Sequence, residues 1–152
     1  MKRITAERYH DISTGHRVVG HENKCRHLHG HRYAIEITLS GPLVATVGAA
    51  DEGMVMDFSA VKAIAQQHVV DPWDHAFLAW RQDTAVVDFL GGIAGHKTAL
   101  FDAPPTAEHL AQTAFQLLNP LYQDCYGNSL QLERIRLYET PNCWADAVRG
   151  ED

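Results

Sequence analysis

Reactive side chains gather in the stretch Lys24-Cys25-Arg26-His27-Leu28-His29-Gly30-His31, and a strand pattern continues from its end. Because residues i and i+2 of an extended chain point to the same face, the imidazoles of His29 and His31 can converge on one ion. A third imidazole would complete a three-histidine zinc site with an open fourth position, which is the catalytic pattern, and His16 lies upstream. Cys25 is a candidate nucleophile or base and is not assumed to be a ligand.

The chain after His31 shows the clearest strand pattern of the sequence. Apolar side chains alternate with mostly polar ones over residues 32–40, as in a strand with one buried face. By the same alternation His29 and His31 fall on the apolar face, where a metal ion is partly shielded from water. That face carries Tyr33, Ile35, Ile37 and Leu39, and the opposite face carries Arg32, Ala34, Glu36, Thr38 and Ser40.

Length, charge and cysteine usage narrow the class of protein. A chain of 152 residues, 45% of them hydrophobic, is expected to form one domain, 1–152, around a single core. A formal charge of −6 without any Lys/Arg run argues against nucleic-acid binding. No apolar run approaches the ~20 residues of a membrane span, the first residues lack a signal-peptide core, and three cysteines at unrelated spacings are typical of free thiols. We therefore expect a cytoplasmic protein that binds neither nucleic acid nor membrane.

Four strands are expected, and together they form an antiparallel sheet. The turn-forming residues 11–15 end the first strand and place His16 at or just beyond it, and a polar loop over 17–28 leads to the central strand. The third strand returns from a hairpin turn at 48–53. The expected strands are residues 2–10, 31–40 with an extension over 43–47, 54–56 and 130–140.

A first helix is expected over residues 58–68, where apolar side chains recur at helical spacing. Either Asp57 or Ser59 can cap its N-terminus, and residues 69–72 end it with a proline. Residues 79–104 follow no clear pattern, and their short apolar runs fit either a helix or a strand.

A second helix is expected after Thr106, a suitable N-cap. Leu110, Ala114 and Leu117 share its inward face, and Asn119-Pro120 should stop it. Strands and helices together indicate the α+β class, with an antiparallel four-stranded sheet and two helices on one face.

Five landmarks in order resemble the 6-pyruvoyl-tetrahydropterin synthase superfamily. The three residues between Cys25 and His-Gly-His resemble its 6-carboxy-5,6,7,8-tetrahydropterin synthase branch, whereas pyruvoyl-type members usually have five. Two features depart from the family: Leu78-Ala79 stands where Leu-Asn is common, and residues 79–104 form a longer connection than expected. The landmarks are His16, Cys25 to His31, Asp74-His75, Pro105-Thr106-Ala107-Glu108 and Tyr138-Glu139-Thr140.

The resemblance implies metal ligands, a catalytic set and a substrate-binding set. The ligands of Zn²⁺ would be His16, His29 and His31. The catalytic set would be Cys25 as base or nucleophile, with Asp74 and His75 as an acid–base dyad. The substrate-binding set would be Glu139 on the pterin ring, Thr106, and for the triphosphate Lys24 and Arg26, with Arg32 and Lys97 as further candidates.

The resemblance also implies the tunnelling fold and its assembly into a barrel-like oligomer. Such a homohexamer is a dimer of trimers with active sites between subunits, so Asp74-His75 of one chain could serve Cys25 of another.

The implied reaction is that of a zinc-dependent carbon–carbon lyase. Its pterin triphosphate substrate, 7,8-dihydroneopterin triphosphate, becomes 6-carboxy-5,6,7,8-tetrahydropterin with release of acetaldehyde and triphosphate, a step of queuosine and 7-deazaguanine biosynthesis. One alternative is a 6-pyruvoyl-tetrahydropterin synthase, which eliminates triphosphate without C–C cleavage. Another is a non-catalytic hexamer that binds a metal or a pterin.

Several candidates also have a purely structural interpretation. Asp74 could cap a helix beside a packed His75, and Glu139 could be an ordinary carboxylate at a strand end. Cys143 is interpreted as structural, and His21 is assigned no function.

Overall fold

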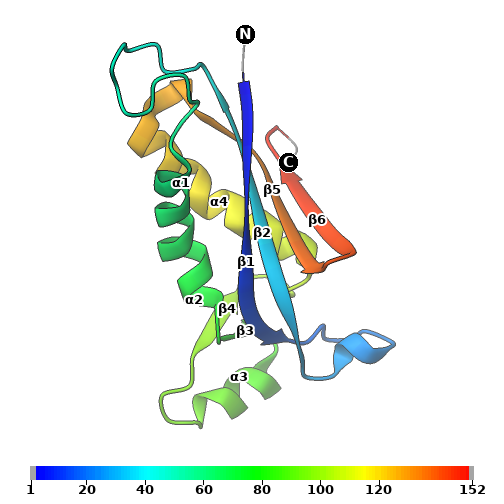
Figure 1. Cartoon of the computed structure of the whole chain (residues 1–152). Helices are drawn as coiled ribbons and strands as arrows, with labels where there is room; N and C mark the ends of the chain where they lie inside the picture. The colour runs from blue at the N-terminus through cyan, green and yellow to red at the C-terminus, as the bar shows by residue number, and fades with distance from the viewer. Residues whose placement is uncertain (1–2, 151–152) are drawn as a thin grey trace.

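The computed structural model describes the backbone of residues 3–150 and the side chains of residues 12–150. Within this range six strands form one sheet, and helices α1 and α4 pack against one of its faces (Figure 1). The strands are β1 (Arg3–His16), β2 (His29–Gly41), β3 (Phe77–Trp80), β4 (Thr98–Phe101), β5 (Gln131–Thr140) and β6 (Cys143–Val148). The helices are α1 (Phe58–Ala65), α2 (Asp71–Trp73), α3 (Thr84–Gly91) and α4 (Ala107–Tyr126).

The sheet is mixed, with the strand order β4-β3-β1-β2-β5-β6. Strands β1, β2, β5 and β6 are antiparallel neighbours, whereas β3 lies parallel to β1 and β4 parallel to β3. The α+β class is confirmed, but the predicted four-stranded antiparallel sheet is wrong. The strand β3 was missed because Leu78 and Ala79 are both buried, which leaves no apolar–polar alternation. The strands β4 and β6 were missed because each has a single buried residue, Phe101 and Ala145, respectively.

The first strand runs further than its sequence indicates. The predicted turn at 11–15 is wrong, because β1 continues to His16 across a register shift between Tyr9 and Ile12. Pairing with β2 stabilises this extended backbone against the local turn preference. The prediction that His16 ends the strand is confirmed, and His16 lies opposite His29. The chain then leaves the sheet as the expected loop, with a single 3-10 turn at Lys24–Arg26.

Residues 42–57 form a loop and not the predicted pair of short strands. Its two arms meet through backbone hydrogen bonds, in which the N–H of Val44 donates to the carbonyl of Met54 at 2.8 Å and the N–H of Gly53 donates to the carbonyl of Val44 at 2.9 Å. Val47 at the tip is 89% exposed, so this segment has little apolar contact that could extend the pairing into a ladder.

The first helix begins as predicted and ends later. Asp57 caps α1 by accepting from the backbone N–H of Ser59 at 2.8 Å. The predicted stop is wrong, because the chain continues through a π-helical turn (Gln66–Val70) into α2. Pro72 lies in the first turn of α2, directly after the π-helical turn, so this proline does not end the helical run.

The second helix also passes its predicted end. The predicted N-cap Thr106 is confirmed, since its side chain accepts from the N–H of His109. The predicted stop at Asn119-Pro120 is wrong, because Pro120 lies inside α4, which continues to Tyr126. Pro120 is exposed, so the carbonyl that loses its helical partner can turn to water.

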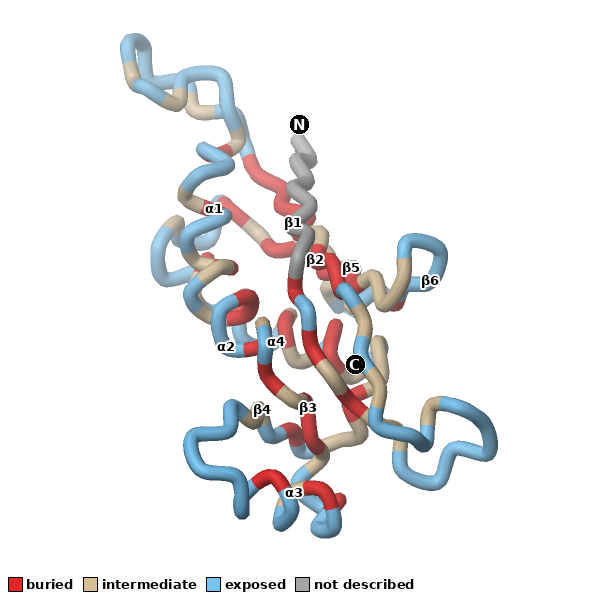
Figure 2. Tube along the Cα trace, turned by 60° about the horizontal axis from the view of Figure 1, so that its bottom comes forward, coloured by how far each residue is buried: buried red, intermediate tan, exposed pale blue. Residues whose placement is uncertain are grey.

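The core lies between the sheet and the helices α1 and α4, where buried segments face each other (Figure 2). Leu110 and Ala114 of α4 are buried as predicted, but Leu117 is 42% exposed and Leu118 takes its place. No helix among the described residues has the length and apolar character that crossing a membrane would require. The predicted apolar face of β2 is confirmed by the burial of Tyr33, Ile35, Ile37 and Leu39.

Candidate active site

Three histidines meet where β1 ends beside the start of β2. The antiparallel pairing sets His16 opposite His29, and the alternation of β2 puts His31 on the same face. Their ligand nitrogens all lie within 4.8 Å of one another, and Nε2 of His16 is 3.0 Å from Nε2 of His29. The structure thus brings together the three side chains that the sequence nominated as metal ligands.

The hydrogen bonds of two rings leave lone pairs facing each other. The Nδ1 atoms of His16 and His29 lie 2.7 Å from the carbonyl oxygens of Pro105 and His27, respectively. Since a carbonyl oxygen only accepts, each Nδ1 carries a proton, and when both rings are neutral each Nε2 carries a lone pair. Two lone pairs this close repel each other, and a cation bound between them removes the repulsion. Neighbouring nitrogens of a tetrahedral zinc site are about 3.3 Å apart, which matches this spacing.

The third ring, that of His31, has a buried nitrogen without a hydrogen-bond partner. This Nε2 lies 3.6 Å from Oε1 of Glu139, and a buried ring nitrogen without a hydrogen-bond partner is a costly feature. Burial is the main cause that lowers the pKa of both His16 and His31, against the opposing charge of Glu139. Both rings are therefore favoured in the neutral form that metal ligation needs. The residues present fit a divalent metal ion such as zinc.

A cavity of about 260 Å³ opens beside the histidines. Cys25 reaches it from the 3-10 turn of the loop, which folds back onto the end of β1 because the N–H of Val18 donates to the carbonyl of Cys25 at 2.8 Å. The cavity therefore unites members of all three predicted sets. Its lining residues are His16, Val18, His21, Cys25, Thr106, Ala107, Glu108, Glu139, Cys143 and Trp144.

Two of the predicted substrate-binding residues enter this cavity from separate elements. Thr106 stands at the N-terminus of α4, where its hydroxyl oxygen accepts the N–H of His109 at 3.4 Å. Glu139 follows buried Leu137 on the same face of β5, and its carboxylate borders both the cavity and His31. A carboxylate in this position can accept from the N–H groups of a bound ring.

Asp74 and His75 contact each other, but neither lines this cavity. Nδ1 of His75 lies 2.8 Å from Oδ2 of Asp74, and the His75 side chain is 81% exposed. Burial opposes the effect, yet hydrogen bonds from His75 and from the backbone of Ser13 hold the pKa of Asp74 below its usual value. The backbone is irregular, as a dyad of adjacent residues requires, because His75 has a φ of 55°. A side chain in this left-handed region costs about 1–2 kcal/mol.

The predicted triphosphate-binding residues Lys24, Arg26 and Lys97 do not line the cavity beside His16. Lys24 and Arg26 flank Cys25 in the loop, but neither lines the described cavity. Lys97, a further candidate, instead donates from Nζ to the carbonyl oxygens of Asp71 at 2.5 Å and Asp74 at 2.6 Å.

Sequence reasoning missed several residues of the site. His21 lines the cavity from the same polar loop as Cys25, a shared position that could have drawn attention to it. Cys143 and Trp144 line it from β6, a strand that the pattern did not reveal. The hydroxyl of Tyr33 lies 3.2 Å from Nδ1 of His16, and burial raises the pKa of Tyr33, which keeps it a phenol.

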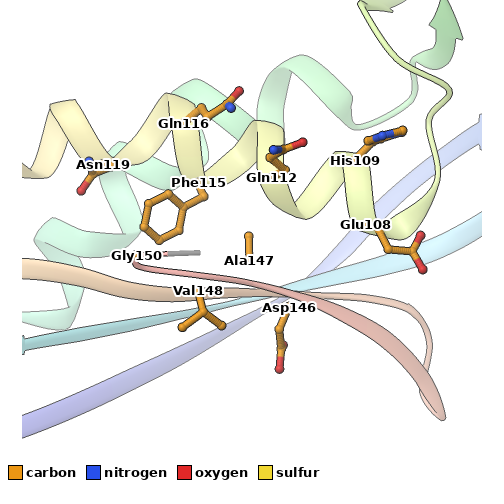
Figure 3. Close-up of a pocket in the computed structure, with 10 residues that line it drawn as sticks. All are labelled: Glu108, His109, Gln112, Phe115, Gln116, Asn119, Asp146, Ala147, Val148 and Gly150. Atoms are coloured by element: carbon orange, nitrogen blue, oxygen red, sulfur yellow. The ribbon is translucent and has the colours of Figure 1, made fainter. Parts of the chain in front are cut away.

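A larger cavity, of about 580 Å³, lies between α4 and β6 (Figure 3). Glu108 lines both cavities, so they adjoin at the start of α4. Two of its polar side chains already have partners, since Asn119 accepts from Arg149 and Asp146 from Arg136. It contains none of the site residues that the sequence predicts.

Comparison with known proteins extends the resemblance over the whole chain. The Rickettsia bellii and Rickettsia felis proteins named 6-carboxy-5,6,7,8-tetrahydropterin synthase are 33% and 31% identical to it over 144 residues. These alignments cover 94% of this chain and 99% of each relative. The Haemophilus influenzae protein of the same name is 31% identical over 148 residues, which is 96% of this chain and 98% of the relative.

Solved structures show the same fold at lower identity. An uncharacterized protein from Wolinella succinogenes superimposes with a TM-score of 0.80 at 19% identity, covering 98% of this chain and 99% of its own. The 6-pyruvoyl tetrahydropterin synthase of Caenorhabditis elegans superimposes with a TM-score of 0.63 at 21% identity, covering 96% of each chain. The family model described as 6-pyruvoyl tetrahydropterin synthase matches residues 4–150, so this chain belongs to the 6-pyruvoyl tetrahydropterin synthase family.

Proposed function

We propose that the protein is a zinc-dependent lyase of the 6-carboxytetrahydropterin synthase type. It converts 7,8-dihydroneopterin triphosphate and one water to 6-carboxy-5,6,7,8-tetrahydropterin, acetaldehyde and triphosphate, in queuosine and 7-deazaguanine biosynthesis. The observation that carries the proposal is the cavity in which Cys25 and Glu139 lie beside His16. The names of the relatives at 31–33% identity support the carboxy-forming branch.

His16, His29 and His31 are the proposed ligands of the zinc ion. When bound, zinc supplies a Lewis acid that polarises the side-chain hydroxyls of the substrate. The facing lone pairs of His16 and His29 and the unpartnered nitrogen of His31 support this assignment.

Cys25 and Glu139 are proposed to act on different parts of the substrate. Cys25 acts at the substrate's side chain, either as a base that removes a proton or as a nucleophile, since Cys25 and His16 line one cavity. Glu139 accepts from the N–H groups of the pterin ring, a charge-assisted pairing that orients the ring. Thr106 lines the same cavity, and Lys24 and Arg26 beside Cys25 supply positive charge for the triphosphate.

The place of Asp74-His75 outside the cavity supports an active site shared between subunits. A side chain that is 81% exposed is free to approach another copy of the chain, so His75 is proposed to serve the Cys25 of a neighbour. The proposed assembly is a homohexamer, a dimer of trimers closed into a barrel. Its size in solution can be measured by light scattering, and a monomer that turns over would contradict the shared site.

The proposal is tested by product analysis. Zinc-loaded protein is incubated with 7,8-dihydroneopterin triphosphate, and acetaldehyde, 6-carboxy-5,6,7,8-tetrahydropterin and triphosphate are quantified together. Equal amounts of all three are expected from the wild type and none from Cys25→Ala. Cys125→Ala is the matched control, because Cys125 is exposed near the far end of α4 and should leave the rate unchanged.

The same experiment separates the alternatives. Loss of triphosphate without acetaldehyde would identify a 6-pyruvoyl tetrahydropterin synthase, the activity that names the family model. Binding of zinc and pterin without any turnover would identify a non-catalytic binder.

A further inference from the structure

The backbone of His75 needs an explanation beyond its own residue type. Its φ of 55° places it in the left-handed region, and no other non-glycine residue in the described chain has a positive φ. Such a conformation persists where the surroundings hold it in place. The contacts around His75 therefore indicate what keeps the dyad in its geometry.

Two hydrogen bonds hold opposite ends of the peptide group between Asp74 and His75. The N–H of His75 donates to the carbonyl of Ser13 on β1 at 2.7 Å. The carbonyl of Asp74 accepts from Nζ of Lys97 at 2.6 Å. Because the peptide group is planar, fixing both ends sets its tilt, which is governed by ψ of Asp74 and φ of His75.

The parallel pairing of β3 with β4 places Lys97 close to the Asp74–His75 peptide group. The N–H of Phe77 donates to the carbonyl of Lys97 at 3.0 Å, and Phe77 lies opposite Thr98 in the parallel pairing of β3 with β4. Lys97 also donates to the carbonyl of Asp71 at 2.5 Å, so one ammonium group joins α2 to the dyad. The connection over residues 79–104 thus supplies a contact to the candidate catalytic residues.

We infer that Lys97 is a positioning residue that holds the Asp74–His75 peptide in the orientation the dyad needs. It acts through the carbonyl of Asp74 and does not touch the substrate. Its catalytic consequence rests on the proposed function, whereas its geometric consequence does not. Positive charge from Lys97 also helps to lower the pKa of Asp74, after the larger effects of burial, which opposes it, and of the hydrogen bonds from His75 and Ser13.

Two simpler roles for Lys97 make different predictions. If the ammonium group only caps the end of α2, its loss lowers stability and leaves the dyad unchanged. If it binds the triphosphate, its loss raises KM. A positioning role lowers kcat and leaves KM nearly unchanged, because the binding cavity contains no Lys97.

The test uses the full zinc-loaded chain with Lys97→Met and Lys97→Arg. For Lys97→Met, kcat is expected to fall about 10- to 100-fold with KM within about twofold, since small misplacements of catalytic groups have effects of this size. Lys97→Arg, which can still donate to two carbonyls, should recover most of the loss. Arg81→Met is the matched control, because Arg81 pairs with the 92% exposed Asp102 in the same segment and does not contact the dyad.

Hydrogen exchange of the His75 amide supplies a readout that does not depend on activity. Exchange should be about tenfold or more faster in Lys97→Met and unchanged in Arg81→Met, because the bond to Ser13 weakens when the other end of the peptide is released. If Lys97→Met does not fold, Lys97→Gln, which replaces the ammonium group with a neutral amide, is measured in the same way. The inference is overturned if exchange at His75 matches the wild type, or if KM rises while kcat is unchanged. If the wild type shows no turnover, the proposed function fails, and exchange alone decides the geometric role of Lys97.

Discussion

The two halves of the candidate site are built in different ways. The histidines lie on β1 and β2, where a long antiparallel ladder sets His16 opposite His29 by register alone. The dyad lies in the link between α2 and β3, where the backbone is irregular and a side chain, Lys97, holds it. A ladder spreads its support over many backbone hydrogen bonds, whereas the dyad depends on a few single contacts. We therefore expect the histidine half to lose function mainly when one of the histidines is replaced. We expect the dyad half to lose its geometry when one of the few contacts that hold it is removed.

The largest expected effect is the loss of one of the three histidines proposed as metal ligands. His29→Ala removes one of the three converging nitrogens, so zinc affinity should fall by about 100-fold or more, and activity with it. Zinc content after equilibration with a competing chelator measures the change. His68→Ala is the control, because His68 lies on the π-helical turn away from the cluster. Wild-type zinc content in His29→Ala would remove the basis for the metal site.

The second effect concerns the ion pair that joins the end of β1 to the start of α3. Arg17, which follows His16, donates to Asp83 at 2.6 and 2.5 Å, and Asp83 is 6% exposed. Asp83→Asn should lower the free energy of unfolding by about 2–3 kcal/mol at neutral pH, since it leaves the guanidinium without its charged partner. Urea unfolding measures this. Asp102→Asn is the control, because Asp102 is 92% exposed and should change stability by less than about 0.5 kcal/mol.

The same ion pair predicts a pH dependence. The Arg17 hydrogen bonds hold the pKa of Asp83 below its usual value of 3.8. A carboxyl with a lowered pKa stabilises the fold above its unfolded-state pKa, and the contribution is lost as the pH falls through the folded-state pKa. From about pH 5 to about pH 3 the wild type should therefore lose more stability than Asp83→Asn. Parallel curves for the two proteins would show that the pair does not stabilise the fold.

A smaller effect is expected where β1 meets β3. A Cβ on Gly15 would lie 3.0 Å from the ring of Phe77 and 3.3 Å from the carbonyl oxygen of His29. Gly15→Ala should therefore reduce stability by about 1–2 kcal/mol, measured by urea unfolding. Gly91→Ala is the control, because no atom lies within 4 Å of a Cβ there. Equal stability of the two variants would mean that β3 can move away from β1 without cost.

The smallest effect tests whether Ser13 holds the dyad through its backbone or through its side chain. Ser13 contacts the dyad through its N–H, which donates to Asp74 at 2.8 Å, and through its carbonyl. Ser13→Ala keeps both groups and should change stability by less than about 0.5 kcal/mol. Ser13→Pro removes the N–H and should increase hydrogen exchange at His75. A large effect of Ser13→Ala would show that the hydroxyl group contributes.

Much of the site could be predicted because its signals are local. The alternation through β2 correctly set the face of His31, and the order of the landmarks matched the family. The extent of the sheet could not be predicted in the same way. The three short strands β3, β4 and β6 carry no apolar–polar period. Pro120 carries a helix-stop signal that an exposed helical position overrides.

The reactive side chains, and the face of the central strand that they share, can be read from the local sequence alone, since alternation along one strand depends only on backbone geometry. Their contacts with residues from other strands and loops depend on how the chain folds. The tertiary structure set His16 against His29, brought Cys143 to the cavity of Cys25, and placed Lys97 on the carbonyl of Asp74. These contacts join residues far apart in the chain, and strand pairing and packing determine them, which no local pattern encodes.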